Sequence, residues 1–229
     1  MRKRKGVYQA LDAAGNVISD ERWQMWLPDG ASAGNGLWQI ESEVTRIAPF
    51  PHPRIESLAA QLVSVGDGPI AWHALSIHTR DGTIEAGVRF EKDAAGQDCA
   101  RFCWRRHQQS WQRQCVWRAD CEIGYNSALF GAAAVWRSRL RPGESRIITM
   151  IDIDAVTLEP LPAQQSWSHR GFEALDTPLG RLSLARYEFG PAGAATPGRL
   201  WCDEDGVVYA YTAADGSGFR LAAVNAKQT

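Results

Sequence analysis

The 229-residue chain has almost no net charge, few cysteines and no long hydrophobic run. A formal charge of −1 excludes a protein that binds polyanions through overall positive charge. No segment approaches the roughly 18 to 20 apolar residues of a membrane-spanning helix, so no integral membrane segment is expected. Neither an RNP-type nor a zinc-knuckle pattern is present, and we therefore expect no nucleic-acid partner.

The first residues are basic but lack the rest of a signal peptide. Arg2, Lys3, Arg4 and Lys5 could form the charged start of one, yet residues 6–19 supply no apolar stretch to follow it. We therefore expect a cytoplasmic protein in which residues 1–5 are disordered. Because there is neither a repeat of fixed period nor a linker, the chain is expected to form a single domain over residues 1–229.

The sequence also lacks the common metal and catalytic signatures. No CxxC pair occurs among the five cysteines, so a zinc site or a disulfide framework is not expected. GxSxG, HExxH, Walker-type and GxGxxG motifs are absent as well. We therefore expect free thiols, no metal and no cofactor; the cysteines are Cys99, Cys103, Cys115, Cys121 and Cys202.

Period-two hydrophobic alternation runs through most of the chain. Residues 84–90 alternate Ile, Ala, Val and Phe with Glu, Gly and Arg, which is typical of a strand with one buried face. Turn signals rich in Asp and Gly separate such segments. The pattern predicts a mainly β protein with a large curled antiparallel sheet, or unclosed β-barrel. Strands are expected near residues 6–11, 17–27, 38–44, 54–65, 70–79, 83–90, 100–107, 110–118, 146–158, 166–174, 181–189, 199–203, 206–212 and 218–224.

One segment breaks this alternation and predicts a helix at residues 127–139. Asn126 or Ser127 can cap its N-terminus, and Arg137 and Arg139 suit its C-terminal end. Pro142 follows and cannot continue it. Because the segment is largely apolar, we expect this principal helix to lie on the concave face of the sheet.

The C-terminal half, residues 120–224, resembles a family of uncharacterised bacterial one-sheet proteins. These are similar in turn to the LolA/LolB lipoprotein carriers, whose long antiparallel sheet rolls around a helix into an unclosed barrel. The order that carries the resemblance is YNSALF and a helix, LRPGES, RIITMIDID, LDTPLGRLSLARYEF and GRLWCDEDGVVYAY. Its strongest marks are the Thr177–Gly180 turn and the Leu200–Gly206 hairpin. The resemblance implies a cavity for acyl chains or other hydrophobic ligands, and supplies no catalytic residue.

Residues 101–118 hold three tryptophans, a phenylalanine and five arginines. If Gln108 and Gln109 form a two-residue turn between two strands, alternation places the aromatic side chains and two guanidiniums on one face. The expected cross-strand pairs are Arg106 with Trp111, Trp104 with Arg113, and Phe102 with Cys115; Trp117 shares their face.

Two interpretations of this aromatic wall compete and do not exclude each other. A structural one is a ladder in which each Arg–Trp pair contributes roughly 0.5–2 kcal/mol as a cation–π contact. The other is a ligand site, in which Arg106 or Arg113 binds a carboxylate or phosphate while the rings grip an apolar body. The candidate binding residues are Phe102, Trp104, Arg106, Trp111, Arg113 and Trp117.

Acidic and histidine side chains supply the candidates for catalysis. Asp152 and Asp154 would lie on one face of a strand, roughly 6.5–7 Å apart and beside apolar groups that raise carboxyl pKa values. They could serve as an acid/base pair, or the strand could simply emerge into water there. His73 and His78 are offset by five residues, so only one of them could face a cavity as a general base.

Two functions from different classes follow from these residues. The first is binding of an amphipathic small molecule or lipid, with an apolar body and an anionic head, inside a half-barrel cavity. The second is a cofactor-independent enzyme, an isomerase, cyclase, lyase or hydrolase, that uses Asp152, Asp154, His73 or His78 on a hydrophobic substrate. Proton transfer needs a titratable group within about 3 Å of the ligand, whereas binding needs only the wall.

Overall fold

The structure is a computed structural model, and it describes residues 2–28, 36–48, 52–63, 71–79, 84–106, 108–118, 121–193 and 196–225. These residues form one sheet of fifteen strands and one helix, α1 (Ala128–Ser138). The strands are β1 (Arg2–Leu11), β2 (Val17–Leu27), β3 (Leu37–Arg46), β4 (Arg54–Val63), β5 (Ala71–Thr79), β6 (Ile84–Lys92), β7 (Asp98–Arg106), β8 (Gln109–Val116), β9 (Cys121–Gly124), β10 (Ser145–Ile153), β11 (Pro160–Thr177), β12 (Gly180–Pro191), β13 (Gly198–Cys202), β14 (Val208–Thr212) and β15 (Gly218–Val224).

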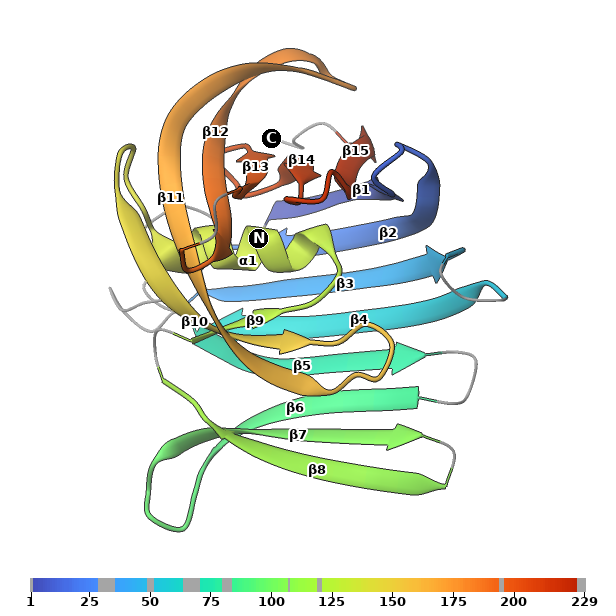
Figure 1. Ribbon diagram of the computed structural model, residues 1–229, viewed down its shortest axis with the longest axis vertical. Helices are drawn as coiled ribbons and strands as arrows, with labels where there is room; N and C mark the ends of the chain where they lie inside the picture. Colours follow the sequence, from blue (N-terminus) through green and yellow to red (C-terminus); the bar gives the residue numbers. More distant parts are fainter. Residues whose placement is uncertain are drawn as a thin grey trace.

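The sheet is curled and does not close into a barrel. Its strand order is β8-β7-β6-β5-β4-β3-β2-β1-β15-β14-β13-β12-β11-β10-β9, so β8 and β9 are its two edges. Neighbours are antiparallel except β9 and β10, which pair in parallel. In Figure 1 the β11–β12 hairpin arches over the top, and α1 lies inside the curl. The predicted fold class is confirmed.

Asp-Gly turns connect many of the strands, as the sequence indicates. Asp12, Asp93 and Asp203 each accept two backbone N–H bonds through Oδ1, from the residues two and four positions further along. Each turn has a glycine three residues after the aspartate, at a φ between 77° and 85°. L-residues rarely adopt this conformation, so the Asp and Gly positions fix the turns together.

The helix also lies where the sequence predicts it. The hydroxyl of Ser127 accepts a hydrogen bond from Leu129 N at its start, and Arg139 ends it in the left-handed region at φ 46°. Its alanines are buried against the sheet. Within the described residues no helix is long and apolar enough to cross a bilayer.

Several strands differ from the sequence predictions. β1 begins at Arg2, so the basic residues expected to be disordered are in the sheet, because Arg4 is buried against Asp203 and Asp205, at 3.3 and 2.8 Å. β10 ends at Ile153 instead of residue 158, since Asp154 starts a turn. The short strand β9 was not predicted; three of its four residues are buried and show no alternation.

Buried hydrogen bonds and ion pairs join the middle of the sheet to the segment between β9 and α1. The Glu56 carboxylate on β4 receives Arg46 Nε at 2.9 Å and Arg54 Nε at 2.7 Å. It also accepts a hydrogen bond of 2.6 Å from the hydroxyl of Tyr125, between β9 and α1. Ser127 donates to Glu21 on β2 at 2.6 Å. These contacts seat the start of α1 on β2–β4.

A second buried contact lies one strand further along. Glu122 on β9 accepts a 3.0 Å hydrogen bond from Trp72 Nε1 on β5 and pairs with Arg137 Nε of α1 at 2.8 Å. Because β6–β8 follow β5 in the sheet, they extend beyond the line along which β9 meets the opposite strands. The lower strands in Figure 1 are this extension.

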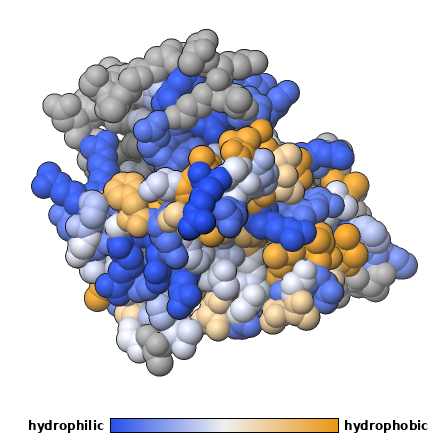
Figure 2. All heavy atoms as spheres, turned by 90° about the horizontal axis from the view of Figure 1, so that it is seen from above, coloured by the Kyte–Doolittle hydropathy of each residue, from blue (hydrophilic) through white to orange (hydrophobic). Residues whose placement is uncertain are grey.

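Some hydrophobic side chains remain outside this core. Figure 2 shows them in patches amid hydrophilic residues on the face seen from above. Large exposed ones in the described C-terminal strands include Ile147, Leu161 and Phe172. Small apolar patches of this kind are normal on the surface of folded proteins, and they do not define a site by themselves.

Replacing the buried carboxylate of Glu56 should destabilise the fold. Glu56→Gln removes the negative charge that two buried guanidiniums contact, and we expect a loss of about 3–5 kcal/mol in the free energy of unfolding. Urea denaturation followed by tryptophan fluorescence measures it. The matched control is Glu41→Gln on the outer face of β3, where an amide oxygen can still accept from Gln24 and the change should stay within about 0.5 kcal/mol. Equal effects of the two variants would contradict this role for Glu56.

Glu122 should make stability depend on pH. Burial raises its pKa to about 7 from an ordinary 4.5, against the opposing effects of Arg137 and Trp72. The folded state therefore holds this proton more tightly, so the stabilisation is complete below pH 4.5 and is lost as the pH rises through 7. The contribution is roughly 3 kcal/mol. Urea titrations should show a smaller decline over this window in Glu122→Gln than in the native chain; parallel curves would refute the assignment.

Candidate functional site

An inner cavity of about 300 Å³ lies between α1 and the C-terminal half of the sheet. It is bounded by the β9–α1 connection and one face of α1, and by strands β10 to β15. Its lining residues are Ile123, Gly124, Tyr125, Asn126, Ser127, Ala128, Phe130, Gly131, Ala134, Met150, Asp152, Ile153, Gln165, Trp167, Phe189, Leu200, Tyr211 and Phe219.

A row of aromatic rings forms one wall of this cavity. Trp167 on β11 stacks on Phe189 of β12 with centroids 4.8 Å apart. Phe189 stacks on Tyr211 of β14 at 5.2 Å, and Tyr211 meets Phe219 of β15 at 5.5 Å. Stacked rings offer a broad apolar surface to a flat or aliphatic ligand.

Small residues on the opposite wall leave the space open. Ala128, Gly131 and Ala134 face it from α1. At Gly131 a Cβ would lie 2.7 Å from Leu200 Cδ1, so the glycine also lets α1 pack closely on β13. Gly124 makes room for a carboxylate, since a Cβ there would lie 1.9 Å from Asp152 Oδ1. Larger side chains at these positions would fill the cavity or displace Asp152.

Asp152 is the acidic group of this cavity. It is half-buried, and burial, the one cause identified, raises the pKa of its carboxyl. None of the described residues forms a hydrogen bond or an ion pair with it, and the described lining contains no Lys, Arg or His. Its negative charge is one of several causes that raise the pKa of Tyr211, whose ring lines the same cavity. Asp152 is thus available to a ligand.

The structure separates Asp152 from the second predicted carboxylate. Asp154 lies in the turn after β10 and does not line the cavity. Its Oδ1 accepts hydrogen bonds from the backbone N–H groups of Val156 and Thr157 and from the Thr157 hydroxyl. These bonds lower the pKa of Asp154. Asp154 therefore has a structural partner set, whereas Asp152 does not.

The predicted wall on β7 and β8 keeps its face but changes its pairs. Trp104 lies opposite Trp111, Phe102 opposite Arg113, and Arg106 opposite Gln109. The turn therefore lies one residue earlier than predicted, and this shifts the pairing by two residues without exchanging the faces. The expected Arg–Trp pairs are thus not formed, and Trp104 stacks on Trp111 at 6.4 Å instead.

The wall residues also differ in their surroundings. Phe102 and Trp117 belong to the core, and Trp117 packs on Phe90 at 4.7 Å. Trp111, near the free edge, is 39% exposed. The Arg113 guanidinium already donates to the Pro160 carbonyl at 2.9 Å and lies 3.3 Å from Glu159. The predicted wall residues whose side chains are described, Phe102, Trp104, Trp111, Arg113 and Trp117, do not line the inner cavity.

Both candidate histidines lie away from the inner cavity. His73 and His78 on β5 are exposed. A β-bulge between Gln61 and Leu62 on β4 inserts His73 as an extra residue, so simple alternation does not place the two on opposite faces as predicted. Neither lines the space that Asp152 faces.

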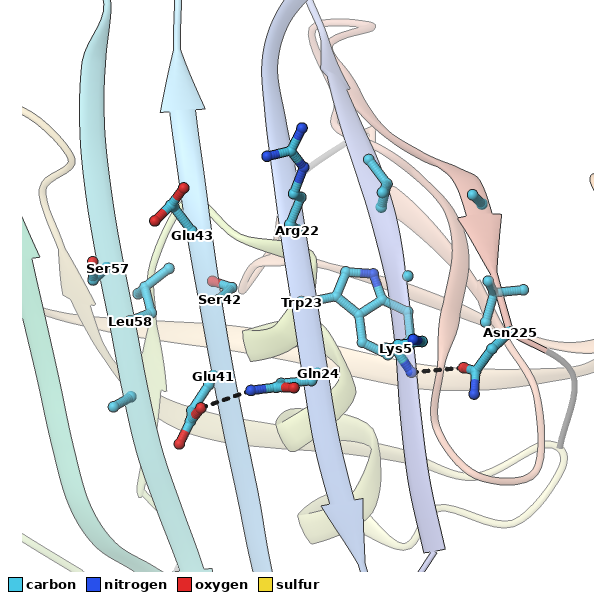
Figure 3. A pocket seen from close by; sticks show the side chains of 15 residues that line it. Lys5, Arg22, Trp23, Gln24, Glu41, Ser42, Glu43, Ser57, Leu58 and Asn225 are labelled. Carbon is cyan, nitrogen blue, oxygen red and sulfur yellow. Dashed lines mark hydrogen bonds between the residues drawn. The ribbon is translucent and has the colours of Figure 1, made fainter. Parts of the chain in front are cut away.

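A second hollow, of about 900 Å³, is more open and lies on the outer face of β1–β4. Figure 3 shows its polar side chains pointing away from α1, with Arg22 and Glu43 from neighbouring strands. Several polar groups there bind one another, as Gln24 does with Glu41 at 2.9 Å. This hollow is larger, but it lacks the stacked aromatic wall and the unpaired carboxyl that mark the inner cavity.

No described group of three or more His, Cys, Asp and Glu side chains could hold a metal ion. All five cysteines are free thiols, and burial raises the pKa of Cys202 to about 12 and also raises that of Cys115. A raised pKa disfavours the reactive thiolate. Cys115 and Cys202 therefore offer little nucleophilic chemistry.

Comparison with known proteins defines the class of fold. The chain matches no family model and no curated protein. A solved structure from Brucella abortus, described as a β-barrel-like protein of domain of unknown function DUF1849, has a TM-score of 0.52 and 8% identity over 98% of this chain and 97% of that one.

Two further solved structures match more weakly. A DUF1089 family protein from Pseudomonas aeruginosa has a TM-score of 0.46 and 17% identity over 85% of this chain and 89% of that one. A protein with a YmcC-like fold from Bacteroides fragilis has a TM-score of 0.42 and 9% identity over 98% and 95%. The likeness to the DUF1849 structure concerns the fold alone. The strand order of the chain itself shows an unclosed β-barrel. The specific likeness to the LolA/LolB carriers stays a prediction.

Proposed function

We propose that the chain binds an amphipathic small molecule or lipid whose apolar body lies in the inner cavity. The observation that carries this proposal is the aromatic row of Trp167, Phe189, Tyr211 and Phe219 facing small residues of α1 across about 300 Å³. This volume is at the lower end of small-molecule sites and suits a body of roughly ten non-hydrogen atoms.

Methyl NMR offers a local test of this proposal. The chain has three methionines: Met1, Met25 and Met150. Met150 lines the cavity, while Met25 is fully buried elsewhere. In protein labelled with ¹³C-methyl methionine, 1-octanol should shift the Met150 signal and leave the Met25 signal in place. Met150→Leu assigns the signal. No Met150 shift at millimolar octanol would reject the proposal.

Removing the central ring should weaken this binding. Phe189→Ala deletes the ring between Trp167 and Tyr211, and we expect about ten- to a hundredfold weaker octanol binding. The matched control is Phe172→Ala on β11, because Phe172 is 69% exposed and outside the cavity lining. Its octanol affinity, measured by the same titration, should equal that of the native chain.

The wall on β7 and β8 is a second candidate position for a ligand with an anionic head. Partly buried Trp104 and exposed Trp111 offer apolar surface there, and Arg113 offers a cation. If the wall binds, octanoate should quench tryptophan emission at about tenfold lower concentration than octanol. This order concerns the wall alone and is independent of the Met150 signal, which reports on the inner cavity. Arg113→Gln should remove this preference, whereas Arg105→Gln should keep it, since Arg105 lies on the other face. Equal binding of acid and alcohol would leave the wall a structural feature.

Catalysis is a second candidate function, favoured by one observation. Asp152 is a half-buried carboxyl with a raised pKa inside a cavity, which suits an acid/base group. The expected reaction is cofactor-independent chemistry on a hydrophobic substrate, in which Asp152→Asn would abolish turnover and leave the melting temperature nearly unchanged.

Location in the cytoplasm also stays a prediction.

A further inference from the structure

We infer that the inner cavity selects amphiphiles whose head carries a hydrogen-bond donor and no negative charge, such as a primary ammonium or a hydroxyl, and that Asp152 binds this head. The inference rests on the proposed function, because it names the chemical class that the same cavity would take. It differs from the anionic head that the sequence suggests.

The first argument is the position of the carboxyl. Asp152 points into the space next to Gly124, where a Cβ would lie 1.9 Å from its Oδ1. Glycine at this position therefore admits the carboxyl to the cavity. Met150, two residues earlier on β10, lines the same space and provides apolar contact beside the acidic group.

The second argument is the missing partner. A buried or half-buried carboxylate normally has a cation or a donor beside it, because desolvation disfavours its charge. Glu56 and Glu122 each have such partners. Asp152 has none among the described residues, so a donor on the ligand would satisfy it. An ammonium would add charge complementarity to the hydrogen bond.

The third argument is the charge of the lining. Among the described lining residues Asp152 is the only acidic one, and none is a Lys, Arg or His. A carboxylate head would meet a like charge without a compensating cation. Tyr211 lines the cavity too, and a tyrosine hydroxyl can accept from, or donate to, a hydroxyl head.

The experiment compares three eight-carbon probes with different heads: 1-octylamine, 1-octanol and octanoate at neutral pH. Affinities are measured from the Met150 methyl shift, which reports on this cavity alone. We expect octylamine and octanol to bind at least about tenfold more tightly than octanoate. Octanoate binding as tightly as octylamine would overturn the inference.

Asp152→Asn provides the decisive variant, because it keeps the shape of the side chain and removes its charge. Its amide can donate to a carboxylate. Octylamine should therefore bind about tenfold more weakly, octanoate should bind more tightly, and the affinity for octanol should change little. The control, Asp154→Asn, lies two residues away outside the cavity and keeps an oxygen for its turn. It should preserve the native order of the probes.

A second variant keeps the inference testable if Asp152→Asn loses its structure. Gly124→Ala keeps the Asp152 charge but displaces the carboxyl, so it should reduce the preference for octylamine over octanoate without reversing it. If probes bind and neither variant changes their order, the inference fails while the proposed binding stands. If no probe shifts Met150 in the native chain, the proposed function itself fails.

Discussion

The rest of the structure depends on one buried carboxylate, that of Glu56. It receives guanidiniums from β3 and β4 and the Tyr125 hydroxyl from the start of α1. Hydrogen-bonded ladders hold each half of the sheet together, but no ladder joins β9 to the opposite strands. Polar side chains make that connection. The position of α1, and with it the inner cavity, therefore follows from a small number of ionic contacts.

The barrel stays open because side-chain contacts, and not a backbone ladder, connect β9 to the opposite strands. β9 meets β3–β5 through Glu122, Tyr125 and the β9–α1 connection, and not through its backbone. Strands β6–β8 lie past this meeting line, so their inner face is covered only in part. Trp117 and Phe102 reach the core, while Trp111 stays exposed near the edge. The aromatic wall that dominates the sequence thus lies outside the cavity.

Much of the fold could be predicted because its signals are local. Asp-Gly turns and period-two alternation placed most strands within a few residues, and the cap at Ser127 placed the helix. β9 was missed because a short strand buried on both faces shows no alternation. The burial of Arg4 depends on Asp203 and Asp205, almost 200 residues away. No local pattern contains that contact.

The candidate site could be predicted only in part, for the same physical reason. Asp152 was recognisable as a carboxylate among apolar residues of a strand. The aromatic row could not be recognised, because its four rings come from four different strands: Trp167, Phe189, Tyr211 and Phe219. In the sequence of its own strand, each of them is an ordinary residue of an alternating pattern. Register decides such sites, and a turn displaced by one residue already changed every predicted pair on β7 and β8.

The acidic side chains of the sheet differ in whether they bind other residues of the protein. Glu21 accepts from Ser127, Glu56 binds two arginines, and Glu122 pairs with Arg137. Each has a protein partner that compensates its desolvation. Burial disfavours the charge of Asp152 in the same way, but none of the described residues gives it a hydrogen bond or an ion pair. A carboxyl that lines an aromatic cavity and has no partner among the described residues is better explained by what the cavity binds than by the stability of the fold.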